Sequence, residues 1–135
     1  MSPESHDAAF AAVSHLPHLI SFALMNAIAG QPQGKDYLSL AGPGFRDFTR
    51  IAASDPTMWR DVFLTNKDAV LDVLGRFAEE LFVLQRAIRM GDGEHLHAYF
   101  TRTRAIRRGI IEAGQDTSAP DFGRVHIDPA AEAKG

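Results

Sequence analysis

The sequence contains no cysteine, and several familiar site motifs are also missing from its 135 residues. Without cysteine, disulfide bonds, thiolate metal ligands and thiol nucleophiles are excluded. The glycine-rich patterns GxGxxG and GxxxxGK[ST], the serine-nucleophile pattern GxSxG and the zinc pattern HExxH do not occur. The sequence therefore contains no dinucleotide-binding site and none of these catalytic centres.

An excess of charge of one sign is also lacking. There are 14 basic and 17 acidic residues, and the net charge of -3 does not indicate a nucleic-acid partner. Residues 1–7 are polar and acidic, unlike a secretory signal. The longest apolar run, Leu19–Ala29, is interrupted by Ser21 and Asn26, and we expect it to be too short to span a bilayer. These features predict a cytoplasmic protein with no membrane partner.

Helical spacing of apolar residues is widespread, whereas strand-like alternation is absent. A first helix is predicted from about Pro3 to Ala29, with Ser2 as its cap and a kink or break at Pro17. A loop is predicted over residues 30–36. Two shorter helices are then expected, at about Phe45–Ala53 and Pro56–Leu64.

The most regular pattern follows Asn66, a residue that can cap a helix. Six apolar residues recur at intervals of 4, 3, 4, 3 and 4: Val70, Leu74, Phe77, Leu81, Leu84 and Ile88. This spacing predicts an apolar seam along a helix about 35 Å long. Gly91-Asp92-Gly93 should end it, and a last helix is expected at about Glu94–Ala113.

Together these elements predict an all-α bundle of five or six helices over residues 1–114, with a long central helix. Residues 115–135 are polar and are expected to form a poorly ordered tail. Because a helix that is apolar on more than one face needs further cover, we expect an intertwined homodimer.

Residues 41–63, AGPGFRDFTRIAASDPTMWRDVF, combine arginines, aspartates, two glycines and the only tryptophan. This mixture suits a small anionic molecule that carries a ring. Arg46, Asp47 and Arg50 allow two interpretations. They are either an exposed intrahelical ion pair, or a group in which Asp47 holds Arg50 so that its guanidinium binds a carboxylate. The glycines Gly42 and Gly44 favour close approach of a ligand to the start of a helix.

Ser14, His15 and His18 lie on one helical face if the helix continues past Pro17. They either bond to carbonyls released by the proline or donate to a ligand oxygen. A zinc site is not predicted, because only His95 and His97 offer further imidazoles. Trp59 is either a core residue or a wall of the pocket. A further cluster is predicted to be a solvated helix surface: Arg102, Arg104, Arg107 and Arg108.

The segments SHLPHLISFAL and AGPGFRDFTRIAASDPTMWRDVFLTNK, with the long helix after them, resemble the C-terminal helical domain of the prephenate and arogenate dehydrogenases of tyrosine biosynthesis. The resemblance covers residues 2–114. It implies a domain that forms the dimer and part of the substrate pocket. In this family an N-terminal Rossmann domain, absent from this sequence, binds NAD or NADP and carries the catalytic histidine. No catalytic or cofactor-binding residue is therefore expected here.

The resemblance also assigns roles to individual residues. Arg50 matches the arginine that binds a substrate carboxylate, Asp47 its supporting partner, and Arg46 a basic position near the domain interface. The substrate pocket would also include a further set: Ser14, His15, His18, Gly44 and Trp59.

The implied activity is the NAD(P)-dependent oxidative decarboxylation of prephenate or arogenate, with this chain inactive unless a Rossmann domain is present in cis or in trans. The alternative is a non-catalytic dimeric module that binds prephenate, arogenate or tyrosine. The sequence leaves open the choice of substrate and of cofactor, feedback by tyrosine, and whether the chain is a natural split protein or a fragment.

Overall fold

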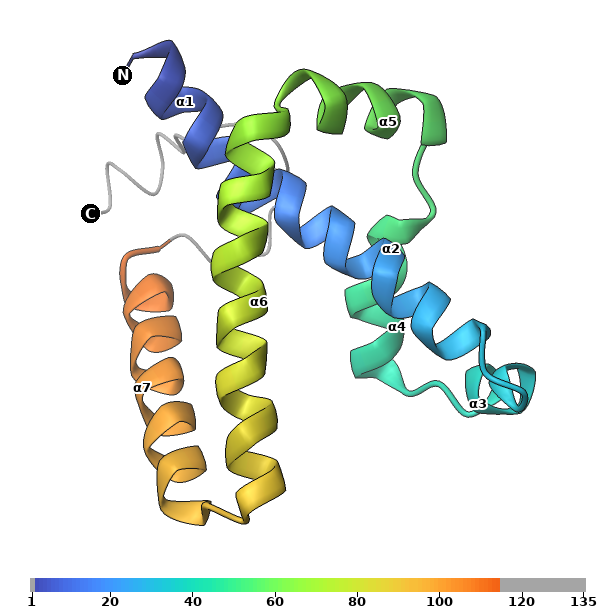
Figure 1. Ribbon diagram of the computed structural model, residues 1–135, viewed down its shortest axis with the longest axis vertical. Helices are drawn as coiled ribbons and strands as arrows, with labels where there is room; N and C mark the ends of the chain where they lie inside the picture. The colour runs from blue at the N-terminus through green and yellow to red at the C-terminus, as the bar shows by residue number, and fades with distance from the viewer. Residues whose placement is uncertain (1, 115–135) are drawn as a thin grey trace. The chain divides into compact units, whose positions relative to one another are not determined.

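The computed structural model describes residues 2–114, which form helices and no strand. The first three elements run on without interruption, so the described residues make six separate helices, and the predicted all-α class is confirmed (Figure 1). The predicted tail, 115–135, lies outside the described residues. The elements are α1 (Pro3–Phe10), η1 (Ala11–His15), α2 (Leu16–Ala29), α3 (Gly34–Ser39), α4 (Pro43–Thr49), η2 (Arg50–Ala52), α5 (Pro56–Thr65), α6 (Lys67–Met90) and α7 (Gly93–Glu112).

The first helix begins and ends where the sequence predicts. The Ser2 hydroxyl accepts a hydrogen bond from the backbone N–H of Ser5 at 3.1 Å, which caps α1. Pro17 does not break the helix. Instead the turn before it, η1, is a π-helical turn in which the N–H of Leu16 donates to the carbonyl of Ala11. A widened turn of this kind is a common way to fit an irregularity inside an α-helix.

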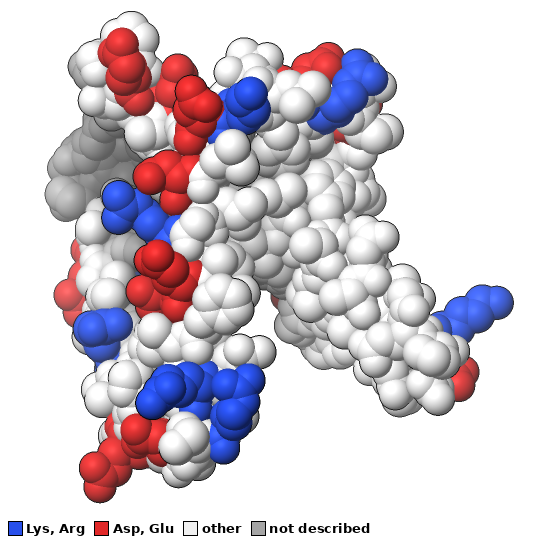
Figure 2. Space-filling view, in the orientation of Figure 1, with Lys and Arg blue, Asp and Glu red and all other residues white. Residues whose placement is uncertain are grey.

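The continuous helix Pro3–Ala29 is long and apolar enough to cross a bilayer by length and composition alone, with a mean hydropathy of 1.5 in its best stretch. The run Leu19–Ala29 therefore underestimates the length of the apolar helix, because the apolar composition continues before Pro17. Helices of protein cores pass the same test, so it is weak evidence for a membrane span. Figure 2 shows an uncharged surface over α2.

The structure divides into two compact units, with the boundary between Ala78 and Glu79 inside α6. In the first unit, α2 contacts α3, α4 and η2. Ser21 of α2 has no exposed surface, and its hydroxyl donates to the carbonyl of Phe48 in α4 at 3.2 Å. This bond satisfies a backbone acceptor where the two helices meet.

The predicted loop at residues 30–36 is shorter than expected, because α3 begins at Gly34. The N–H of Gly34 donates to the carbonyl of Gln31 at 2.9 Å, and the N–H of Tyr37 donates to that of Gln33 at 3.0 Å. A helix of six residues is less than two turns long. Its sequence therefore carries too few apolar repeats to be recognised.

The next two helices lie close to their predicted positions. Helix α4 begins two residues earlier than expected, with Pro43 in its first turn, and η2 continues it through Arg50. Helix α5 starts after Asp55, whose carboxylate accepts the N–H of Thr57 at 3.0 Å. The predicted restart at this point is therefore confirmed.

The second unit contains the end of α6 and all of α7, joined by Gly91 with a φ of 66°. The hydroxyl of Tyr99 donates to Glu80 at 2.7 Å and links the two helices. Leu81 and Ile88 of the predicted apolar seam are exposed in the single chain, as are Phe100 and Ile106 of α7.

Candidate functional site

Trp59 lies at the centre of an aromatic cluster in the first unit. It is 8% exposed, and its ring stacks on the ring of His18 with centroids 3.9 Å apart and planes 22° apart. The ring of His15 meets it edge-on at 5.9 Å, and that of Phe63 lies 5.6 Å away. Two turns of the first helix and one face of α5 thus form a continuous aromatic surface.

The structure therefore brings together the histidines and the tryptophan that the sequence singled out. The Nδ1 of His18 donates to the carbonyl of Ser14 at 3.0 Å. The N–H that Pro17 lacks would bind the carbonyl of Val13, so a bond from His18 to a carbonyl released by the proline stays a prediction. A neutral His18 that donates through Nδ1 has an acceptor at Nε2. His18 Nε2 can therefore accept a hydrogen bond from a ligand while Nδ1 keeps its bond to the carbonyl of Ser14.

His15 has a different partner. The side-chain amide of Asn66 lies 3.3 Å from His15 Nδ1 and donates to the carbonyl of Asp7 at 3.0 Å. Asn66 was predicted only as a helix cap. Instead, its side chain joins the start of α6 to α1 and η1, and no bond to its Oδ1 is recorded within residues 2–114.

Burial, followed by the nearby His18, holds the pKa of His15 below its ordinary value of 6.5, while Asp7 opposes the shift. The neutral imidazole is therefore the favoured form near neutral pH.

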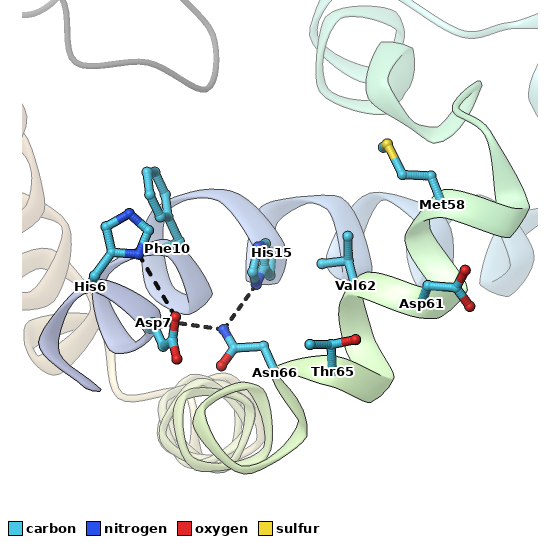
Figure 3. A pocket seen from close by; sticks show the side chains of 9 residues that line it. All are labelled: His6, Asp7, Phe10, His15, Met58, Asp61, Val62, Thr65 and Asn66. Carbon is cyan, nitrogen blue, oxygen red and sulfur yellow. Dashed lines mark hydrogen bonds and ion pairs between the residues drawn. The ribbon is translucent and has the colours of Figure 1, made fainter. Parts of the chain in front are cut away.

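An open pocket of about 450 Å³ lies beside this cluster, between α1 and α5 (Figure 3). His15 is on its wall, and its floor includes Asn66. The carboxylate of Asp7 lies 3.7 Å from Nδ1 of His6. The other lining residues are Phe10, Met58, Asp61, Val62 and Thr65. The pocket combines apolar walls with a few polar groups, as small-molecule sites do.

The arginine segment lies on α4 and η2, which contact α2. Arg46 donates to the carbonyl of Ala41 at 2.5 Å, and Arg50 is exposed at the start of η2. Asp47 forms no salt bridge with a described residue, so its support of Arg50 stays a prediction. A Cβ on Gly42 or Gly44 would meet nothing within 4 Å, so packing of the described residues does not require glycine there.

Two members of the site were not recognised from the sequence as site residues. Phe63 is four residues after Trp59 and therefore on the same face of α5, which the spacing could have shown. Asn66 is 51 residues from His15 in the chain, and no local pattern links the two.

The fold and the cluster define an all-α domain with aromatic and histidine side chains gathered on its first unit. The family model "Prephenate dehydrogenase, dimerization domain" matches residues 2–102. The chain belongs to this family, as its sequence segments suggested.

Among curated relatives, prephenate dehydrogenase of Bacillus subtilis is 34% identical over 129 residues, which cover 95% of this chain and 34% of the relative. Cyclohexadienyl dehydrogenase of Zymomonas mobilis is 38% identical over 112 residues, which cover 82% of this chain and 38% of the relative. The chain thus spans only about a third of the length of these relatives.

Solved structures agree with the family. Prephenate dehydrogenase from A. aeolicus, in complex with hydroxyphenyl propionate and NAD+, matches 82% of this chain and 39% of its own, with 43% identity and a TM-score of 0.75. Arogenate dehydrogenase from Synechocystis matches 81% of this chain and 40% of its own, with 32% identity and a TM-score of 0.76.

A nicotinamide dinucleotide does not fit the described residues. Its usual site is a glycine-rich turn between a strand and a helix, whereas residues 2–114 contain no strand. A metal ion is not indicated either, because no group of three or more potential ligands is found among the described residues.

Proposed function

We propose that this chain is the helical part of a cytoplasmic prephenate or arogenate dehydrogenase, where it binds the substrate carboxylate and forms the dimer. The complete protein would oxidise and decarboxylate its substrate with NAD or NADP. The observation that carries the proposal is the His18–Trp59 stack on α2 and α5, with Arg50 on an element that contacts α2. A ring surface and a guanidinium on elements in contact suit a ring that bears a carboxylate.

The likeness to a structure bound to hydroxyphenyl propionate supports this class of ligand, because that molecule also joins a ring to a carboxylate. Arg50 would grip the carboxylate, with Asp47 and Gly44 beside it. Trp59, His15, His18 and Ser14 would position the ring. Their contribution is orientation and charge complementarity, which together lower the barrier of a reaction carried out elsewhere in the protein.

The cofactor and the group that accepts the substrate proton would be held by a Rossmann domain, in the same chain or in a second one. The relatives are about three times as long as this chain, which leaves room for such a domain. The described residues supply none of its features.

The dimer would cover the apolar surface that a single chain leaves exposed. The helix Pro3–Ala29 and the exposed side chains of α6 and α7 provide this surface. A subunit interface explains an apolar helix without placing it in a membrane.

Replacement of Arg50 by Ala tests the proposal. In the complete enzyme we expect kcat/KM for the substrate to fall. The fall should correspond to a loss of about 2–4 kcal/mol of transition-state stabilisation, as for other broken charge-assisted pairs. Arg76→Ala is the matched control, because Arg76 is an exposed arginine paired with Asp72 on α6. If Arg50→Ala stayed within about twofold of the unmodified enzyme, the assignment of Arg50 would be wrong.

A further inference from the structure

The two hydrogen bonds of Asn66 define which of its side-chain atoms is the nitrogen. The atom 3.0 Å from the backbone oxygen of Asp7 must be a donor, since a carbonyl oxygen can only accept. The side-chain oxygen at this position would instead repel it. The same nitrogen lies 3.3 Å from Nδ1 of His15, so its second hydrogen is directed at the imidazole.

His15 Nδ1 must then carry a lone pair. In the neutral imidazole this leaves the proton on Nε2, which becomes a donor. His18 is in the opposite state, because its Nδ1 donates to the carbonyl of Ser14 and its neutral Nε2 is an acceptor. Two histidines three residues apart thus present different groups, one a donor and one an acceptor.

We infer that Asn66 is a positioning residue that holds His15 as the Nε2–H tautomer, so that this ring donates to the ligand while His18 accepts. The claim about the tautomer stands on the geometry alone, and the claim about the ligand rests on the proposed function.

Asn66 is well placed for this role because its own backbone is held at both ends. Its N–H donates to the carbonyl of Val62 in α5 at 3.0 Å, and its carbonyl accepts the N–H of Val70 in α6 at 3.0 Å. The rings of Trp59 and Phe63 meet His15 edge-on and oppose its rotation. Imidazole and amide are therefore both held in place.

The charged and titratable groups around His15 are few. Asp7 from α1 and His18 from α2 act on its charge, and His6 and Asp61 line the same pocket. Burial lowers the pKa of His15, which agrees with a ring that accepts at Nδ1.

Nitrogen-15 NMR of the full-length protein with labelled histidine measures the tautomer directly, with the signal of His15 identified by its loss in His15→Gln. We expect Nε2–H for His15 and Nδ1–H for His18 when the rings are neutral. A His15 ring that carries its proton on Nδ1, or a mixture of both forms like that of free histidine, would overturn the inference.

Asn66→Asp should reverse the tautomer, because a carboxylate accepts from Nδ1–H and also raises the pKa of the ring. The variant also loses the bond to the carbonyl of Asp7, since a carboxylate cannot donate. Above that raised pKa, the variant loses its Nε2–H donor. We therefore expect the affinity of the variant for prephenate to fall between pH 6.5 and 9. This fall should be about tenfold larger than that of the unmodified enzyme over the same range, which is the usual effect of one hydrogen bond. A general loss of affinity from the added negative charge would not depend on pH in this way.

Asn26→Ala is the matched control, because Asn26 donates only to the carbonyl of Phe22 on its own helix. It should change neither tautomer nor pH dependence. If folded Asn66→Asp kept the Nε2–H tautomer, Asn66 would not determine it. An Arg50→Ala result that contradicts the proposed function would leave the measurement of the tautomer unaffected.

Discussion

Individual side chains of the first unit carry most of the polar interactions between its helices. Ser21, His15 and Asn66 each bind a group on another helix or at another turn, whereas many other hydroxyls and amides bond within their own turn. Because an unpaired buried group costs more than a surface bond contributes, these side chains should dominate the effects of single substitutions.

Ser21→Ala should lower the free energy of unfolding by about 1 kcal/mol, because it removes the hydrogen bond from the fully buried Ser21 hydroxyl to the carbonyl of Phe48. Urea denaturation measures the change. Ser39→Ala is the control, since Ser39 is exposed and donates within its own turn to Asp36, and it should have almost no effect. Equal losses in both variants would contradict this account.

His15 should make the stability of the protein depend on pH. Its pKa in the folded protein lies below the ordinary 6.5, so between these two values the unfolded chain binds more protons. The stabilisation is therefore present above about pH 6.5 and lost as the pH falls through the folded pKa. Thermal unfolding between pH 7 and 5 should show a smaller decline in His15→Gln than in the unmodified protein. The same decline in both would contradict the assignment.

At the scale of helices, two glycines have opposite roles. A Cβ on Gly34 would lie 2.5 Å from the carbonyl oxygen of Ala29 and 2.7 Å from that of Ile28, both backbone atoms that cannot move away. A Cβ on Gly75 in α6 would meet nothing within 4 Å. The first glycine is needed for the close approach of α2 and α3, whereas the second is not needed for packing within the described chain.

Gly34→Ala should therefore destabilise the protein by about 1–3 kcal/mol through steric overlap. Gly75→Ala should stabilise the helix by about 0.5–1 kcal/mol, because alanine loses less backbone entropy. Denaturant midpoints of the two variants, compared with the unmodified protein, test both signs at once. A stabilised Gly34→Ala variant would show that the α2–α3 turn differs from this structure.

At the scale of the molecule, residues 2–114 leave many large apolar side chains exposed. Phe82 on α6 is 64% exposed, and exposed apolar side chains continue along α7. Its family is described as a dimerization domain, which agrees with a second copy as the cover.

Phe82→Asp should weaken the proposed dimer, since it removes an aromatic ring that the second copy would cover and introduces a charge. We expect the dissociation constant to rise on the order of a hundredfold, as measured by sedimentation equilibrium. Gln85→Glu adds the same charge to an exposed polar position of α6 and is the control. A dimer that resists Phe82→Asp would place the interface on another surface.

The sequence alone determined the helical class, the positions of the long helices and the family. These depend on local rules: apolar spacing along α6, Asp55 before Pro56, and the long motif that contains Trp59. Residues close in sequence act on each other within one or two turns, so their effects can be recognised without a structure.

Only the tertiary structure decided how the site is assembled. It showed a π-helical turn before Pro17 in a helix that does not break there, revealed α3, and placed Asn66 against His15 across 51 positions of chain. It also determined which ring nitrogen of His15 and of His18 faces a protein partner. Contacts of this kind arise from the packing of helices on one another, and no periodicity in the sequence records which side chains will meet.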